Sequence, residues 1–306
     1  MAPMQNSAPQ NIDPNIDPIV KVSALSKSFG SRQILHAIDF TIPRGRIYGL
    51  IGHNGAGKTT AINALLGLTT YKGEVNVLGL EPFKNRAELM LDIAFVSDIA
   101  SLPRFLKVFE LLELMEKLHP NFKRDKAQEI LNESGIKDNL KIKNLSKGML
   151  AQLHLALVMA IDAKLLVLDE PTLGLDISFR KKFYRRLVED YMNENRSILI
   201  TTHQVDEIEF LLTDLIFLRN GHIVLDAGME EISSRFVQVL VSPDALAAAR
   251  EKNPIYATTQ LGQNIMIFDG LDREVAERLG VTSTPSISDL FMALMENSQV
   301  DPGAQK

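Results

Sequence analysis

The chain has 306 residues, of which 45% are hydrophobic, enough to build the core of one large domain or of two unequal ones. Its net charge of −5 gives no support for nucleic-acid binding as the main role, and the absence of cysteine excludes disulfides and cysteine-ligated metal. No apolar run approaches the length of a membrane span, so we expect no transmembrane segment in the chain itself.

The first segment, residues 1–19, is expected to be a mobile tail. It contains the tetrapeptide Asn-Ile-Asp-Pro twice in succession, and proline opposes helix formation. A strand is predicted over residues 20–23, followed by a turn over residues 25–30 that presents Phe29. Phe29 is a candidate for stacking on a purine base, whereas a ring at the end of a strand, taken alone, more often covers the core.

A glycine-rich stretch follows the apolar run at residues 47–51 and leads into a helix-forming segment at residues 60–66. Strand, glycine loop and helix in this order predict a polyphosphate cradle, because backbone N–H groups and the positive end of the helix dipole converge there. Lys58 would reach the β- and γ-phosphates, and the Thr59 hydroxyl would coordinate Mg²⁺. The nucleotide-binding residues predicted here are Gly52, His53, Asn54, Gly55, Ala56, Gly57, Lys58, Thr59 and Thr60.

From residue 108 the hydrophobic pattern takes on helical spacing, and a second helix is predicted over residues 126–133, ended by Gly135. A third helix runs to residue 161, with Ser146 placed as its N-cap. A Ser-x-Gly sequence at a helix start is also a weak signal for a second phosphate clamp. These helices interrupt an α/β pattern, so we expect a helical insert over about residues 99–162.

Two predicted buried strands end in polar residues. Residues 165–168 lead into Asp169 and Glu170, and because adjacent strand residues point to opposite sides, one carboxylate can hold a metal while the other faces the space beyond the γ-phosphate. The next strand, residues 197–201, leads into Thr202 and His203. Buried acids are costly as structure alone, which favours a functional interpretation.

A basic helix is predicted after the turn at residues 171–176. We expect it to face solvent, with the i,i+4 pairs Arg185–Glu189 and Arg186–Asp190. Further on, Asn220-Gly221 predicts a hairpin between two strands.

Past Gly228 the sequence predicts a small α/β appendage, with strands at residues 236–241 and 265–268 and helices at residues 244–252 and 273–279. A last helix follows Ser286 and has one apolar face, which consists of Ile287, Leu290, Phe291, Leu294 and Met295.

Taken in order, these motifs resemble the ATP-binding cassette of ABC transporters, from about Val20 to about Gly228. The glycine loop corresponds to the Walker A motif, residues 145–149 resemble the LSGGQ signature, and residues 165–170 resemble the Walker B strand. Residues 174–176 resemble the D-loop, and His203 the switch histidine. The resemblance adds six residues to the predicted nucleotide contacts: Phe29, Ser146, Lys147, Gly148, Met149 and Asp176.

The resemblance implies ATP and Mg²⁺ as cofactors and assigns roles at the site. Mg²⁺ would be held by Thr59, Asp169 and Asp98, an acid that stands where the family commonly has its Q-loop glutamine. Glu170 would polarise the attacking water, and His203 would contact the γ-phosphate, so these two are the predicted catalytic residues. The signature also departs from the family pattern, with Lys147 in place of its first glycine.

The implied function is that of an ATPase subunit, at the cytoplasmic face of a membrane, that powers transport, expected to be export, through a separate integral membrane permease subunit. The signature would contact the ATP of a second cassette, so a homodimer or heterodimer is expected. The permease contact is expected in the groove near residues 98–118. Alternatives are a soluble cassette ATPase acting on ribosomes or DNA, which usually has two cassettes or a long coiled coil, and a P-loop kinase, which has no need of the signature. Nucleic acid is not an expected partner.

The predicted fold class is therefore α/β, a P-loop NTPase core with mixed and parallel sheet, a helical subdomain insert and a small C-terminal α/β appendage. The predicted divisions are the tail at residues 1–19, the cassette at residues 20–229 and the accessory region at residues 230–306.

Overall fold

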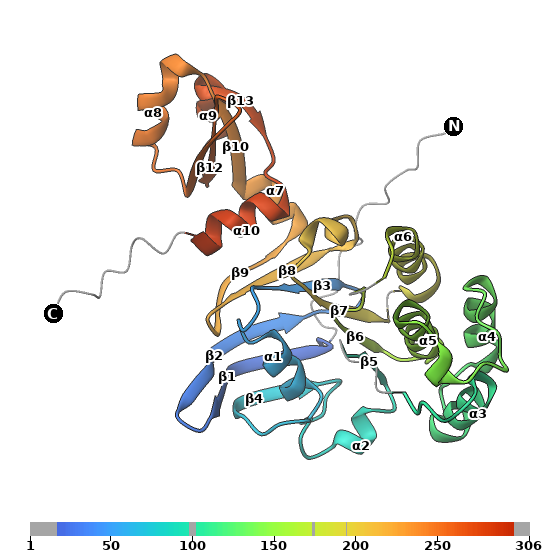
Figure 1. Ribbon diagram of the computed structural model, residues 1–306. Helices are drawn as coiled ribbons and strands as arrows, with labels where there is room; N and C mark the ends of the chain where they lie inside the picture. The colour runs from blue at the N-terminus through green and yellow to red at the C-terminus, as the bar shows by residue number, and fades with distance from the viewer. Residues whose placement is uncertain (1–16, 98–101, 173–174, 194, 297–306) are drawn as a thin grey trace.

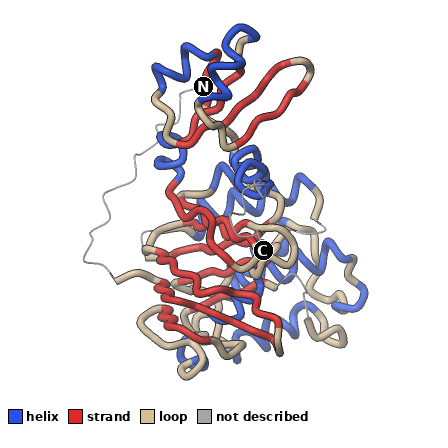
Figure 2. The backbone as a smooth tube through the Cα atoms, turned by 90° about the vertical axis from the view of Figure 1, so that its left-hand side faces the viewer, coloured by secondary structure: helices blue, strands red, loops and turns tan. Residues whose placement is uncertain are grey.

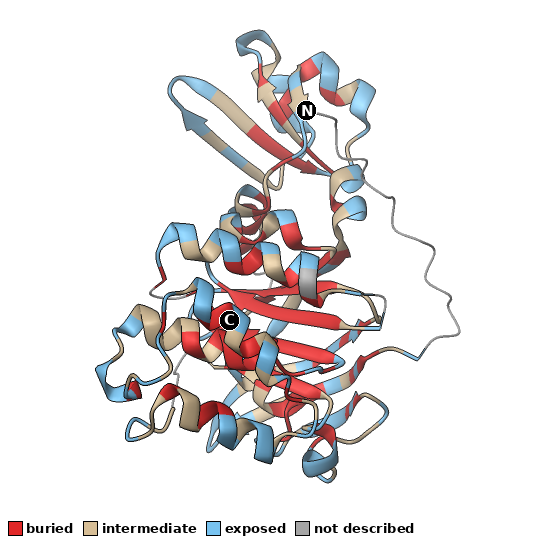
Figure 3. Cartoon of the chain, turned by 90° about the vertical axis from the view of Figure 1, so that its right-hand side faces the viewer, coloured by how far each residue is buried: buried red, intermediate tan, exposed pale blue. Residues whose placement is uncertain are grey.

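A central sheet separates two hydrophobic cores in the computed structural model, which describes residues 17–97, 102–172, 175–193 and 195–296. Within these residues the sheet has six strands in the order β5-β6-β7-β3-β8-β9, and only β9 runs antiparallel to its neighbour (Figure 1). The strands span Ile93–Val96 (β5), Leu165–Asp169 (β6), Ser197–Thr202 (β7), Ile47–Ile51 (β3), Asp214–Arg219 (β8) and His222–Gly228 (β9). The five parallel strands are buried on both faces and read as largely apolar runs, as expected of parallel strands (Figure 3).

One face of this sheet packs on a second, antiparallel sheet of order β2-β1-β4 and on helix α1. These elements span Val20–Phe29 (β1), Arg32–Ile42 (β2), Lys72–Val77 (β4) and Lys58–Leu65 (α1). The predicted turn at residues 25–30 is wrong over most of its length, because irregular pairing with β2 carries β1 on to Phe29, opposite Arg32. The tail prediction is also wrong at Ile19, which is fully buried and donates its amide hydrogen bond to the Ile42 carbonyl.

The helices of the predicted insert lie on the β5–β6 side of the molecule (Figure 1). The helices on this side span Arg86–Leu89 (α2), Val108–Leu118 (α3), Arg124–Glu133 (α4), Lys147–Met159 (α5) and Ile177–Arg186 (α6), with a 3₁₀ turn at Ile142–Asn144 (η1) and a π turn at Leu187–Tyr191 (η2). Ser146 is the N-cap of α5, as predicted. Arg186 forms an ion pair with Glu133 on α4, whereas its predicted pairing with Asp190 stays a prediction, because the Asp190 side chain lies outside the described part of the structure. The basic helix is thereby tied to the insert.

The C-terminal region forms a four-stranded antiparallel unit within the described residues, of order β11-β12-β10-β13, that stands apart from the central sheet (Figure 2). Helix α7 (Met229–Arg235) precedes this unit, and the elements that follow have the split βαβ order. They span Phe236–Val241 (β10), Leu246–Glu251 (α8), Tyr256–Gln260 (β11), Gln263–Asp269 (β12), Arg273–Leu279 (α9) and Gly280–Ser283 (β13), with a 3₁₀ turn at Pro243–Ala245 (η5). The two predicted strands and two predicted helices are confirmed, and β11 and β13 were not predicted.

The last helix, α10 (Ile287–Glu296), leaves this unit and packs on the cassette (Figure 1). Its predicted apolar face is confirmed, since Ile287, Leu290 and Phe291 are buried in the same cluster as Phe217 of β8. It lies beside two short 3₁₀ turns, Val205–Glu207 (η3) and Glu209–Leu211 (η4). The boundary near residue 229 stays a prediction, but α10, inside the predicted accessory region, packs against the cassette.

Across the described part of the chain, no helix combines the length and the apolar content needed to span a bilayer.

Candidate functional site

The loop between β3 and α1 has a conformation that requires glycine at two positions. A Cβ atom at Gly52 would lie 2.4 Å from the carbonyl oxygen of Leu218, so only glycine fits there. Gly57 has a φ of +110°, a left-handed conformation that residues with a Cβ rarely adopt. The loop therefore curls tightly at the N-terminus of α1, where unpaired amides and the helix dipole favour an anion.

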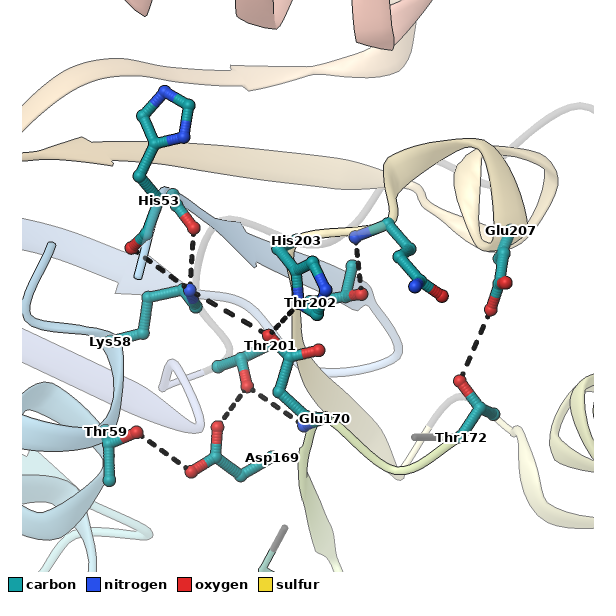
Figure 4. A network of polar contacts seen from close by, with 12 residues as sticks. His53, Lys58, Thr59, Asp169, Glu170, Thr172, Thr201, Thr202, His203 and Glu207 are labelled. Carbon is teal, nitrogen blue, oxygen red and sulfur yellow. Dashed lines mark hydrogen bonds and ion pairs between the residues drawn. The ribbon is translucent and has the colours of Figure 1, made fainter. Parts of the chain in front are cut away.

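Lys58, the first residue of α1, is a buried cation at the centre of the site. Its side chain is only 7% exposed, and its Nζ donates to the carbonyl oxygens of Gly52, at 2.6 Å, and of His53, at 3.4 Å (Figure 4). Nζ also lies 3.9 Å from Glu170 Oε1. Burial lowers the pKa of Lys58, whereas the carboxylates of Glu170 and Asp169 act in the opposite direction. The Lys58 amine therefore lies against backbone carbonyl oxygens of the loop between β3 and α1.

Asp169, at the end of β6, is held by hydroxyl groups from two other elements. Thr59 of α1 donates to its Oδ2 at 3.1 Å, and Thr201 of β7 donates to its Oδ1 (Figure 4). A threonine hydroxyl and a carboxylate are the oxygen ligands that Mg²⁺ prefers, so the two residues fit that ion. The third predicted metal ligand, Asp98, lies outside the described residues.

Glu170 directly follows β6 and turns its side chain toward Lys58 and His203. Its φ of +49° is unusual for a residue with a side chain and is supported by an amide hydrogen bond to the Thr201 carbonyl at 3.1 Å. His203 Nδ1 lies 2.9 Å from Glu170 Oε1, a hydrogen bond in which the imidazole donates to the carboxylate (Figure 4). The two predicted catalytic residues are thereby brought together.

A cavity of about 360 Å³ opens beside these side chains. Its lining combines an exposed aromatic ring, part of the glycine loop and both acids, and consists of Phe29, Arg32, Ile34, Asn54, Gly55, Gly57, Lys58, Thr59, Thr60, Asp169 and Glu170. Lys27 Nζ lies 4.9 Å from the centre of the Phe29 ring. The sequence reasoning missed Arg32 and Ile34, although a cation so soon after the candidate stacking ring was an available signal.

Other predicted contacts do not line this cavity. The Ser146 hydroxyl accepts from the Met149 amide at 3.2 Å, and the Asp176 carboxylate accepts from the Phe179 amide at 2.9 Å, so each caps the helix that follows it. Ser146 and Lys147 are exposed at the start of α5. The nucleotide roles predicted for Ser146, Lys147, Gly148, Met149 and Asp176 stay predictions.

Three residues of the glycine loop also fall outside the cavity lining: Gly52, His53 and Ala56. The His53 imidazole points away from the network around Lys58 (Figure 4), so only its backbone faces the predicted phosphate position.

A second polar cluster joins the turn after β6 to α6 and η3. Glu207 accepts from the Thr172 hydroxyl at 3.4 Å and forms an ion pair with Arg180. Thr172 also lies 3.1 Å from the hydroxyl of buried Tyr184. Sequence reasoning missed this cluster, because its members come from three separate segments with no shared motif.

The sequence of this chain is similar to that of ATP-binding proteins of ABC transporters. A family model described as "ABC transporter" matches residues 35–173. The bacitracin transport ATP-binding protein BcrA of Bacillus licheniformis is 31% identical, over 71% of this chain and 72% of its own length. The lantibiotic transport ATP-binding protein SrtF of Streptococcus pyogenes is 31% identical, over 71% of this chain and 96% of its own. The Nod factor export ATP-binding protein I of Rhizobium meliloti is 29% identical, over 90% and 87%.

Solved structures have the same fold. An ATP-binding subunit of an ABC transporter matches with a TM-score of 0.65 at 24% identity, over 71% of this chain and 92% of its own. A dimeric ATP-binding cassette bound to ADP and Pi matches with a TM-score of 0.60 at 22% identity, over 69% and 98%. At these identities the similarity concerns the fold.

Proposed function

This chain belongs to the ABC transporter ATP-binding proteins, and from that premise we propose that it couples ATP hydrolysis to export through a separate membrane-spanning subunit. The chain is an ATP-binding subunit and an ATPase. One observation carries the assignment of its catalytic site: Lys58, Asp169 and Glu170 line one cavity, and His203, from a third segment far away in sequence, contacts Glu170 beside it.

We propose a division of labour among these side chains. Hydrolysis of a phosphoanhydride asks the protein to position a water molecule and to offset charge that develops on the γ-phosphate. Lys58 and the amides of the glycine loop offset that charge. Thr59 and Asp169 would hold Mg²⁺, which supplies further charge neutralisation when bound.

Glu170 would orient the attacking water and accept its proton. Its Oε1 is fixed between Lys58 Nζ at 3.9 Å and His203 Nδ1 at 2.9 Å, so the carboxylate is held in one orientation before substrate binds. His203, the other partner of this carboxylate besides Lys58, would contact the γ-phosphate. General-base assistance of this kind contributes about 10²- to 10⁴-fold to a rate.

The test is ATP turnover by Glu170→Gln. We expect turnover to fall by about 10² or more, with ATP binding retained, because the amide keeps the shape of the side chain but cannot accept a proton. Glu189→Gln, at an exposed position on η2, is the matched control and should keep full turnover. Turnover at the normal rate in Glu170→Gln would remove Glu170 from the mechanism.

We further propose that two cassettes close over two nucleotides. The support is that Ser146 and Lys147 are exposed and do not line this chain's own cavity. Size-exclusion chromatography of Glu170→Gln with MgATP should give a dimer, and adding Ser146→Arg should give a monomer. Ser234→Arg on α7, also exposed, is the control. A dimer that persists with arginine at residue 146 contradicts the arrangement.

We propose that the membrane-spanning partner docks where α3 meets the segment after α2, with this subunit at the cytoplasmic face of the membrane. The Asn121 side chain donates to the Leu91 carbonyl at 2.9 Å and joins the two segments, which leave Leu91 and Leu118 exposed. Phe105, just before α3, is 78% exposed. Exposed apolar side chains at both ends of α3, with Leu91 beside its last residue, support an interaction site along this helix.

Leu118→Glu tests this docking site. The variant should keep the ATPase activity of the isolated chain but no longer sediment with membranes that contain its permease partner, because a charge would enter an apolar contact. Val281→Glu on β13 is a control, since Val281 is 71% and Leu118 69% exposed. Equal sedimentation of both variants would place the docking site elsewhere.

A further inference from the structure

The last helix of the chain touches the phosphate loop. The Phe291 ring of α10 lies 4.9 Å from the His53 ring, tilted by 56°, and 5.3 Å from the Phe217 ring in an edge-on arrangement at 78°. These are favourable geometries for aromatic pairs. Phe291 is 7% exposed, whereas His53 is exposed, so the contact lies at the edge of the interface between α10 and the cassette.

The contact reaches the centre of the site through the backbone of His53. The His53 imidazole points away from the polar network and toward α10, while its carbonyl oxygen accepts from Lys58 Nζ at 3.4 Å (Figure 4). The contact between the His53 ring and Phe291 therefore restrains the His53 backbone, whose carbonyl oxygen accepts the hydrogen bond from Lys58. Phe291 contacts the loop at His53 and is not itself among the residues that line the cavity.

The same helix is also bound to the segment that follows His203. The Ile287 amide donates to Glu209 Oε1 at 3.3 Å, and the Ser288 hydroxyl donates to Asp206. At the other end of α10, Arg219 donates to the Leu294 carbonyl at 2.7 Å. The helix is held at both ends by the cassette.

Its connection to the four-stranded unit is short. Strand β13 ends at Ser283 and α10 begins at Ile287, so residues 284–286 alone separate them. Pro285 in this connection is buried, and the Ser286 hydroxyl accepts from the Asp289 amide at 3.0 Å. A displacement of the four-stranded unit would thus be carried directly to α10.

We propose that α10 is a positioning element of the ATP site, through which the C-terminal unit sets the ATP affinity of the cassette. Phe291 holds the phosphate loop through His53, and the start of α10 holds the segment after His203. A partner or ligand that binds the four-stranded unit can change ATP affinity only if it favours one placement of α10 over another. The inference rests on the ATP site proposed above.

The test is steady-state ATPase kinetics of full-length Phe291→Ala and Phe291→Leu. The free energy contributed by one aromatic pair corresponds to about a two- to tenfold change in affinity. KM for ATP should therefore rise by about that factor, while kcat changes less than twofold. Leucine fills the same groove without a ring and guards against loss of folding. Met292→Ala, on the same helix but 39% exposed, is the control and should leave both constants unchanged.

A double-mutant cycle with His53→Ala identifies the contact. If Phe291 acts through His53, the double variant should have the KM of the more affected single variant, whereas independent effects would multiply and overturn the proposal. Unchanged KM in both Phe291 variants, or a fall in kcat alone from loss of folded protein, would also overturn it. A wild-type chain that does not hydrolyse ATP would instead refute the proposed function.

Discussion

Thr201 donates its hydroxyl hydrogen bond to Asp169, across the boundary between β7 and β6. Both residues are buried, and the other carboxylate oxygen of Asp169 accepts from Thr59 at 3.1 Å. A carboxylate held from both sides cannot rotate freely. The proposed metal ligand is therefore oriented by a residue that is not itself a ligand.

Replacing Thr201 by valine should weaken the proposed Mg²⁺ site. Valine has nearly the same shape but no hydroxyl, so Asp169 loses an orienting partner, and the Mg²⁺ concentration for half-maximal ATPase activity should rise by about tenfold or more. The free energy of unfolding should fall by about 1–3 kcal/mol, because a buried acceptor loses its donor. Thr201→Ser keeps the hydroxyl and is the control. An unchanged Mg²⁺ requirement in a folded Thr201→Val protein would contradict this role.

Asp226 on β9 predicts a pH dependence of stability. Asp226 is exposed on β9, and incomplete hydration of its carboxyl group, together with the nearby carboxylates of Asp214 and Glu231, raises its pKa to about 6. The folded chain thus keeps this proton up to about pH 6, whereas the unfolded chain releases it near its ordinary pKa of about 4. Stability should fall as pH rises through this window and level off above it.

Asp226→Asn isolates that contribution. The variant cannot ionise, so it should be more stable than wild type at pH 7, with the difference shrinking as pH approaches 4. Urea unfolding at several pH values measures this, with Asp244→Asn at an exposed position as control. A difference that does not vary with pH would exclude Asp226 as its source.

Gly52→Ala should disrupt the phosphate loop. Its Cβ atom would lie 2.4 Å from the backbone of β8, which cannot move without breaking the central sheet. We expect loss of ATP binding, measured by calorimetry, and a lower unfolding temperature. At Gly148 an added Cβ atom would lie 4.0 Å from the Ser146 hydroxyl oxygen, an ordinary contact, so Gly148→Ala should keep the fold and ATP binding by the isolated chain. Normal ATP binding by Gly52→Ala would show that the loop can relax.

Local patterns were enough to predict much of the cassette. The strand, glycine loop and helix around Lys58, the Ser146 cap and the Asn220-Gly221 hairpin depend on residues within a few positions of one another. The meeting of Asp169, Glu170 and His203 was also predictable, because carboxyl ends of neighbouring parallel strands lie at one edge of a sheet.

Local sequence patterns could not predict how segments distant in the chain pair with one another. The extension of β1 to Phe29 depends on its partner β2, and Arg186 found Glu133 on α4 where a local pairing was expected. Propensity and charge spacing describe what a segment can do alone, whereas the choice among several partners is made by packing.

The sequence by itself determined that the chain carries a phosphate loop, two acids and a histidine at strand ends, and a final helix with one apolar face. Only the tertiary structure decided what covers that face. Periodicity shows that a helix must bury one side, but its partner depends on how the intervening four-stranded unit returns the chain to the cassette. For this reason the contact between Phe291 and His53 could be found only in three dimensions.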